Sequence, residues 1–171
     1  DLTPASAAGY CSLNCATGTY FNLTTANCDS CPVNSTTALT IGAATISQCA
    51  CKAGYYGTAS SRNCTLCPAD TYKPAVADGA AASVCTSCPP GTFTNGTIGA
   101  ASVSFCMCLP GYVPATNATL GCVPCPPNSY KTAAGNGTCT ACPGTTWTNS
   151  VGGVSSAAQC VNASAPTYYY L

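Results

Sequence analysis

The sequence predicts a small disulfide-rich fold, mainly β-strand and loop, in which tandem cysteine-rich modules form an elongated array with almost no helix. Seventeen of the 171 residues are cysteine, a density typical of disulfide scaffolds. Four pairs of cysteines recur at the same spacing of 18 residues. Pro, Gly, Asn and Thr interrupt every segment, and no apolar period of 3.6 residues is sustained, so short strands and turns are expected.

Three kinds of loop recur in a fixed order and define a module of six cysteines, C…CxxC…CxC…C. The motif CPVNSTTALTIGAATISQC (31–49) returns as CPPGTFTNGTIGAASVSFC (88–106) and as CPGTTWTNSVGGVSSAAQC (142–160). The predicted organisation is an N-terminal segment with part of a preceding module (1–14), module one (15–64), module two (67–122), a partial module three (125–160) and a tail (161–171).

Aromatic residues follow the same phase as the cysteines. Tyr20, Tyr72 and Tyr130 each lie five residues after the first cysteine of a module. We therefore expect each module to pack its own aromatic rings against its own sulfurs, with further contacts mainly to adjacent modules, as in repeat arrays.

The composition argues against several classes of function. The formal net charge is zero, so nothing steers the chain towards nucleic acid or an anionic membrane. No run approaches the roughly 18–20 apolar residues of a membrane span. With no His and no Glu, the usual general bases reduce to four Asp, so we expect no enzymatic activity and no cofactor. Asp70 and Asp78 share a loop, but such a pair is more often a turn feature than a calcium site.

The CxxC pairs raise a choice between zinc, redox chemistry and disulfides. Structural zinc sites use Cys and His in paired knuckles, and the CxC pairs and the absence of His fit that poorly. A redox CxxC needs nearby positive charge, and the chain holds only four Lys and Arg. Disulfide half-sites are therefore expected, with no metal site, and they place the chain in an oxidising, extracellular compartment.

N-glycosylation sequons support the secretory interpretation. An Asn in N-x-[ST] context occurs at Asn22, Asn34, Asn63, Asn95, Asn117, Asn136 and Asn162. The sequons occupy different phases of the repeat, so they predict a glycan coat that hydrates a surface poor in charge. Asn63 is expected to be the least occupied site, because the middle residue of its sequon is Cys64.

The run CPADTYKPAVADGAAASVCTSCPPGTFTNGTIGAASVSFCMCLPGY (67–112) resembles the cysteine-rich, EGF-like repeat of ephrin receptors. Its CP-x-x-T-[YF] openings also resemble tumour-necrosis-factor receptor modules, and similar repeats occur in surface proteins of ciliates and other protists. The EGF-like resemblance implies an interlocked pairing within each module: Cys15–Cys31, Cys28–Cys49, Cys51–Cys64, Cys67–Cys88, Cys85–Cys106, Cys108–Cys122, Cys125–Cys142 and Cys139–Cys160. The alternative joins neighbours along the chain, as in Cys15–Cys28 and Cys31–Cys49, and sequence alone leaves both open.

Two functions follow from these features. The first is a structural glycoprotein of a cell-surface coat or extracellular fibre, and the second is a receptor or adhesin ectodomain that binds a protein or a glycan. For the first, the broken repeats at both ends predict head-to-tail self-association, with Tyr168, Tyr169, Tyr170 and Leu171 of one copy packed near residues 1–14 of the next. Cys11 is left unpaired or intermolecular. The alternative is a boundary within a longer repeat, with Cys11 bonded to a half-module outside the sequence.

Overall fold

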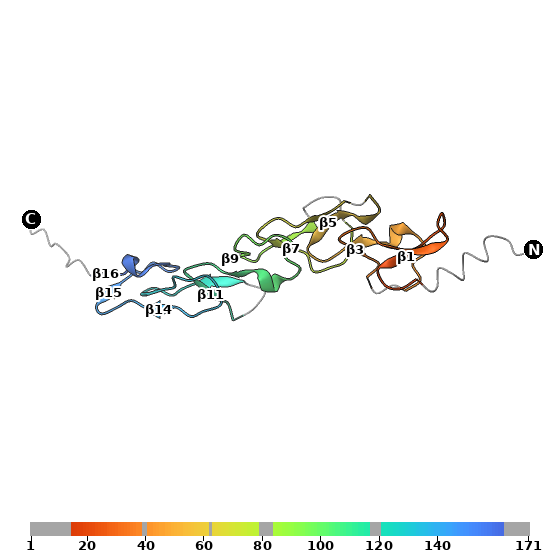
Figure 1. Cartoon of the computed structure of the whole chain (residues 1–171). Coiled ribbons are helices and arrows are strands. Elements are labelled where there is room, and N and C mark those ends of the chain that lie inside the picture. The colour runs from red at the N-terminus through yellow and green to blue at the C-terminus, as the bar shows by residue number, and fades with distance from the viewer. Residues whose placement is uncertain (1–14, 39–40, 62, 79–83, 117–120, 163–171) are drawn as a thin grey trace, which may run out of the picture. The chain divides into compact units, whose positions relative to one another are not determined.

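The computed structural model describes residues 15–38, 41–61, 63–78, 84–116 and 121–162 (Figure 1). The chain divides into two compact units, one of residues 1–87 with 96–105 and the other of residues 88–95 with 106–171. Cys11 and the assembly residues Tyr168, Tyr169, Tyr170 and Leu171 lie outside the described residues, as does Asn117.

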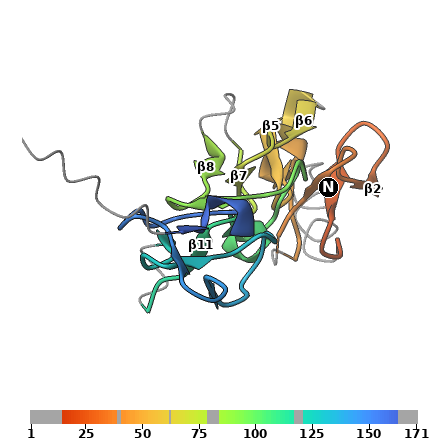
Figure 2. The ribbon, with the colours of Figure 1, turned by 90° about the vertical axis from the view of Figure 1, so that its left-hand side faces the viewer.

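All described strands form two-stranded antiparallel hairpins (Figure 1, Figure 2). The first unit contains β1 (Thr19–Asn22) with β2 (Asn27–Ser30), β3 (Ser35–Thr36) with β4 (Ala50–Cys51), β5 (Tyr55–Thr58) with β6 (Asn63–Leu66), and β7 (Thr71–Tyr72) with β8 (Thr86–Ser87). The second contains β9 (Thr92–Phe93) with β10 (Met107–Cys108), β11 (Tyr112–Pro114) with β12 (Cys122–Pro124), β13 (Ser129–Tyr130) with β14 (Thr140–Ala141), and β15 (Thr146–Trp147) with β16 (Val161–Asn162).

Helical structure in the described residues is limited to short 3₁₀ turns. They are η1 (Ile46–Gln48), η2 (Ala59–Ser61), η4 (Val103–Phe105) and η6 (Ala157–Gln159). Three of them end at or just before a cysteine, where the chain turns into the next strand. The predicted disulfide-rich β-and-loop class with almost no helix is confirmed, while the elongated arrangement of modules stays a prediction.

Every described disulfide joins cysteines that are neighbours along the chain, so each bridge closes one hairpin loop. The bridges are Cys15–Cys28, Cys31–Cys49, Cys51–Cys64, Cys67–Cys85, Cys88–Cys106, Cys108–Cys122, Cys125–Cys139 and Cys142–Cys160. Two of the predicted pairs, Cys51–Cys64 and Cys108–Cys122, are confirmed. The interlocked pairs are wrong: Cys15–Cys31, Cys28–Cys49, Cys67–Cys88, Cys85–Cys106, Cys125–Cys142 and Cys139–Cys160.

Hairpin geometry explains the correction. Strand β2 runs back beside β1 in a register from Thr19↔Ser30 to Asn22↔Asn27, and this returns Cys28 to within 5.5 Å of Cys15, Cα to Cα. Cys31 is only three positions beyond Cys28, so loop-closure entropy differs little between the two schemes and the strand register selects the local pair. The two residues of each CxxC then lead directly into the next hairpin.

Cystines form the core of the protein. In the first module Cys49, Cys51 and Ala59 form one buried cluster, with Tyr20 and Tyr55 packed against it. This confirms, for module one, the predicted packing of repeat aromatics against sulfurs. Trp147 differs, because its side chain is 45% exposed.

Candidate functional site

A backbone frame recurs at equivalent positions of the three modules. A glycine N–H in the loop between the third and fourth cysteines of each module donates to the carbonyl of that module's first cysteine: Gly42 to Cys15 (2.8 Å), Gly99 to Cys67 (2.8 Å) and Gly153 to Cys125 (2.9 Å). The backbone N–H of the residue six positions after that cysteine donates to the carbonyl of the residue that follows the glycine. These bonds run from Phe21 to Ala43 (2.8 Å), from Lys73 to Ala100 (3.0 Å) and from Lys131 to Val154 (3.1 Å). The repeat in the sequence therefore corresponds to a pattern of backbone hydrogen bonds that recurs in each module.

A second set of bonds forms a joint between consecutive modules. Gly54 follows the fifth cysteine of module one; its N–H donates to the Lys73 carbonyl (2.8 Å) and its carbonyl accepts from the Cys67 N–H (2.9 Å). Gly111 makes the same two bonds, to Lys131 (2.8 Å) and from Cys125 (2.7 Å).

Only glycine fits this joint. Gly54 has φ +79° and Gly111 has φ +82°, in the left-handed region, and a Cβ at either would overlap a backbone carbonyl of the next module. The close approach of two backbones is what allows both hydrogen bonds to form. We call this pair of glycines, with their partners, the glycine joint.

A lysine is buried beside each glycine joint. Lys73 is 4% exposed, and its Nζ donates to the carbonyls of Ala75 (2.8 Å), Ala77 (2.8 Å) and, from the preceding module, Cys51 (3.5 Å). Burial lowers the pKa of Lys73 below its ordinary value of 10.5, and the Asp78 carboxylate partly opposes this shift.

Lys131 repeats the arrangement in the second unit. It is buried, its Nζ donates to the Ala133 carbonyl (2.7 Å), and burial lowers its pKa as well. Both ammonium groups thus have carbonyl acceptors for their N–H donors although the side chains are buried.

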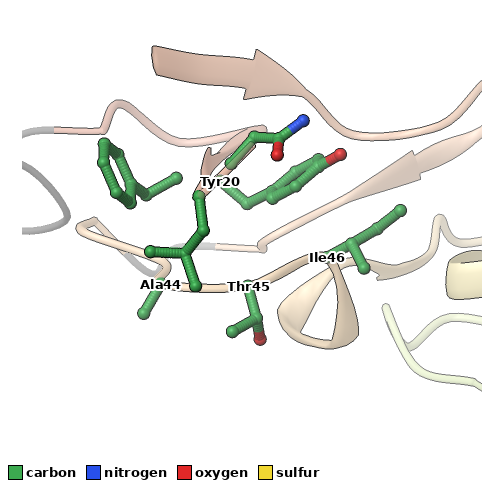
Figure 3. Close-up of a pocket in the computed structure, with 7 residues that line it drawn as sticks. Tyr20, Ala44, Thr45 and Ile46 are labelled. Atoms are coloured by element: carbon green, nitrogen blue, oxygen red, sulfur yellow. The ribbon is translucent and has the colours of Figure 1, made fainter. Parts of the chain in front are cut away.

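Two hollows in the first unit lie beside Tyr20, and Figure 3 shows one of them. One hollow of about 160 Å³ is lined by Tyr20, Phe21, Asn22, Leu23, Ala44, Thr45 and Ile46. A second, of about 300 Å³, is lined by Tyr20, Ser30, Cys31, Pro32, Val33 and Ile46.

The two hollows share Tyr20 and Ile46, and Leu23 lines one of them while Val33 lines the other. Leu23 is 71% exposed and Val33 is 81% exposed. We call Leu23, Tyr20, Ile46 and Val33 the apolar strip.

The described sequon asparagines lie on hairpins and turns. Asn63, Asn95, Asn136 and Asn162 are exposed, and Asn22 and Asn34 are half-buried. Asn34 and Asn95 occupy left-handed turns, with φ 63° and 52°. These positions do not test whether the asparagines carry sugar or whether Asn63 is the least occupied, so glycosylation stays a prediction.

The cysteine chemistry is settled by covalent bonds. The sixteen cysteines from Cys15 to Cys160 are all in disulfides, so none of them is a thiolate for zinc or for redox catalysis. Among the residues that the structure describes, no group of three or more His, Cys, Asp or Glu could hold a metal ion. Asp78 instead accepts from the Cys51 N–H (3.0 Å) and the Ala59 N–H (3.2 Å), and Asp70 occupies a left-handed turn at φ 62°. No helix in the described ranges is long and apolar enough to cross a membrane.

The sequence profile of one family, tyrosine-protein kinase ephrin type A/B receptor-like, matches residues 54–106 and 111–160. Together these segments cover more than half of the chain. The chain belongs to this family. The ephrin-receptor-like segments begin at Gly54 and Gly111, so each starts at a glycine joint and ends at the fourth cysteine of the next module. The predicted module boundaries stay predictions, since a repeat can be framed from any of its hairpins.

The family and the disulfides together define the class of the protein. Ephrin-receptor-like repeats are cysteine-rich modules of a non-catalytic type, and a chain with eight such bridges belongs in an extracellular, oxidising environment. The resemblance to tumour-necrosis-factor receptor modules stays a prediction. No curated protein sequence matches the chain closely enough to count as a relative.

Sequence reasoning missed the buried lysines and a set of buried threonines. Thr37, Thr94 and Thr148 lie six residues after the third cysteine of each module and are almost fully buried. Thr37 accepts from the Gly18 N–H (2.8 Å) and Thr148 from the Asn128 N–H (2.8 Å). The sequence could have indicated both sets of residues. The threonines, and the Tyr-Lys pairs at 72–73 and 130–131, recur at fixed distances from the cysteines of their modules.

Proposed function

We propose that the chain is a structural extracellular glycoprotein, a repeat segment of a cell-surface coat or fibre. The observation that supports this most is that the glycine joint occurs twice with the same backbone partners. A joint made of backbone bonds specifies a fixed relation between consecutive modules whatever their surface residues are. Such a joint can be repeated along a chain, which is the property a structural repeat needs.

The sequons extend the proposal to a glycan coat. The exposed Asn63, Asn95, Asn136 and Asn162 are accessible to glycosylation on both units. Because the chain has little charge of its own, attached sugars would supply most of its hydration.

Assembly is tested on the native, glycosylated protein by negative-stain electron microscopy. Periodic fibres are expected, and dispersed particles at every concentration contradict the structural role. Head-to-tail self-association through the C-terminal tail is tested separately by deleting residues 166–171, with a variant that changes Tyr168, Tyr169 and Tyr170 to Ser as a second perturbation. Fibres that persist unchanged in both variants exclude the tail as the joint between copies.

A second candidate is a receptor or adhesin ectodomain, and the apolar strip favours it. Leu23 and Val33 expose apolar side chains in two hollows that both include Tyr20, and such exposed apolar surface is a common feature of binding sites. Substituting Leu23→Ser and Val33→Ser together should abolish adhesion of the protein to cells if this role holds, and should leave fibres intact if the structural role holds.

A further inference from the structure

Two sequons adjoin the apolar strip in sequence, one beside Leu23 and the other beside Val33. Asn22 lines the same hollow as Leu23. Asn34 directly follows Val33 at the tip of a turn that is closed by the Ser35 N–H and the Pro32 carbonyl (3.0 Å). The two most exposed residues of the strip are therefore each next in sequence to a glycosylation acceptor.

The geometry of β1 directs the Asn22 side chain towards Tyr20. Side chains two residues apart on a strand lie on the same face, so Asn22 and Tyr20 share one face of β1. Asp29 is the cross-strand neighbour of Tyr20, and its carboxylate accepts a hydrogen bond from Asn22 Nδ2 at 2.5 Å. The Thr24 N–H donates to Asn22 Oδ1 (2.9 Å) and fixes the amide further.

This anchoring is compatible with glycosylation. An asparagine amide has two N–H groups, and an N-linked sugar replaces only one of them. The other can keep its bond to Asp29, so a sugar on Nδ2 begins beside the Tyr20 ring. Pyranose rings have a C–H face and hydroxyl edges, which suits an apolar surface with a polar rim.

We propose that the N-linked sugars of Asn22 and Asn34 pack over the apolar strip and are its occupants. The sugar on Asn22 covers Tyr20 and Leu23, and the sugar on Asn34 covers Val33. This inference rests on the proposed glycoprotein function and deepens it, because it gives two of the sequons a structural role. Removal of the exposed apolar surface from water is the driving force.

Asn136 provides the matched contrast within the same chain. It is exposed and lies between Gly135 and Gly137, and a Cβ at Gly135 would meet nothing within 4 Å. A sugar there has open space on the Gly135 side, and Asn136 lines neither of the hollows that form the strip. Thr24→Ala, Thr36→Ala and Thr138→Ala each remove one acceptor sequence while leaving the asparagine in place, which preserves the bond between Asn22 and Asp29 in the first variant.

The test uses the glycosylated full chain from a secretory host with isotope-labelled sugars. Nuclear Overhauser contacts between sugar protons and the Tyr20 ring are expected, and they should be lost in the Thr24→Ala variant. The Thr24→Ala and Thr36→Ala variants should bind more of a hydrophobic dye, and each should have a Tm lower by about 2–4 °C. The Thr138→Ala variant should match the wild type in all three measurements.

The outcomes are distinct. Sugars present on Asn22 and Asn34 without contacts to the strip, or dye binding equal in all variants, overturn the inference and leave the strip open to a protein partner. If peptide mapping finds sugar on Asn95 and Asn136 but not on Asn22 or Asn34, the inference fails and the glycoprotein function stands. If no sequon carries sugar, the glycoprotein function itself fails.

Discussion

The glycine joint allows a sharp test of how consecutive modules are coupled, through the Gly54→Ala substitution. Two effects add at this position. An L-residue in the left-handed region costs about 1–2 kcal/mol. The new Cβ would also lie well inside the 3.0 Å limit that real Cβ atoms respect, against the Gly99 carbonyl, so the two backbones must separate.

Separation of the backbones breaks the bonds from Gly54 N–H to Lys73 and from Cys67 N–H to Gly54. At about 0.5–1.5 kcal/mol for each bond, the joint adds roughly 2 kcal/mol to the loss of stability. Gly96→Ala is the control, because Gly96 has φ +78° and a Cβ there meets nothing within 4 Å. That variant carries the left-handed penalty alone.

The measurement is chemical unfolding with the disulfides intact, together with hydrogen exchange at the Cys67 amide. Gly54→Ala should lower the free energy of unfolding by about 2 kcal/mol more than Gly96→Ala does. It should also speed exchange at the Cys67 amide, while Gly96→Ala leaves that amide protected. Equal losses in the two variants, with the Cys67 amide protected in both, would refute the joint as the coupling element.

Three further predictions follow from the core and the bridges. Peptide mapping without reduction should recover the pairs Cys15–Cys28 and Cys31–Cys49, and recovery of Cys15–Cys31 would restore the interlocked scheme. Thr148→Val removes a buried hydroxyl that accepts from the Asn128 N–H and donates to the Val151 carbonyl, and the loss of two bonds should cost about 1–3 kcal/mol by chemical unfolding, whereas Thr140→Val, on an exposed strand position, should have little effect. Because the folded-state pKa of Lys73 lies below 10.5, the unfolded chain binds more protons just below pH 10.5, so the free energy of unfolding should rise with pH through that window. A Lys73→Met variant should reduce this rise, and an unchanged slope would contradict the assignment.

The fold class could be predicted because it depends on the number and spacing of the cysteines and on the turn residues, all of which can be read from the sequence. One cysteine in ten leaves little room for another core, and the recurring spacing of 18 residues marks the loops that the disulfides close. The pairing could not be predicted in the same way. Cys28 and Cys31 are only three positions apart, so either can reach the same partner in sequence terms, and the choice depends on the register of β1 and β2.

The candidate site was predicted only in its outline. The sequons could be read from the sequence, but the apolar strip depends on hairpin and turn geometry that brings Leu23, Ile46 and Val33 around Tyr20. The buried Lys73 runs against the usual expectation that lysine is exposed, and the carbonyls of Ala75, Ala77 and Cys51 around its ammonium group explain its place.

The sequential disulfides have a mechanical consequence. Because each bridge joins neighbouring cysteines, tension applied along the chain passes through the sulfurs and the short CxxC and CxC spacers, and the loops carry no load. The two cysteines that close each loop are 13 to 18 positions apart, and the chain between them is held in reserve. Reducing one bridge under load would release roughly 40–55 Å of chain, given about 3.3–3.6 Å per extended residue. The thiol–disulfide balance of the surroundings would therefore set how far the protein can be stretched, in discrete steps of one loop at a time.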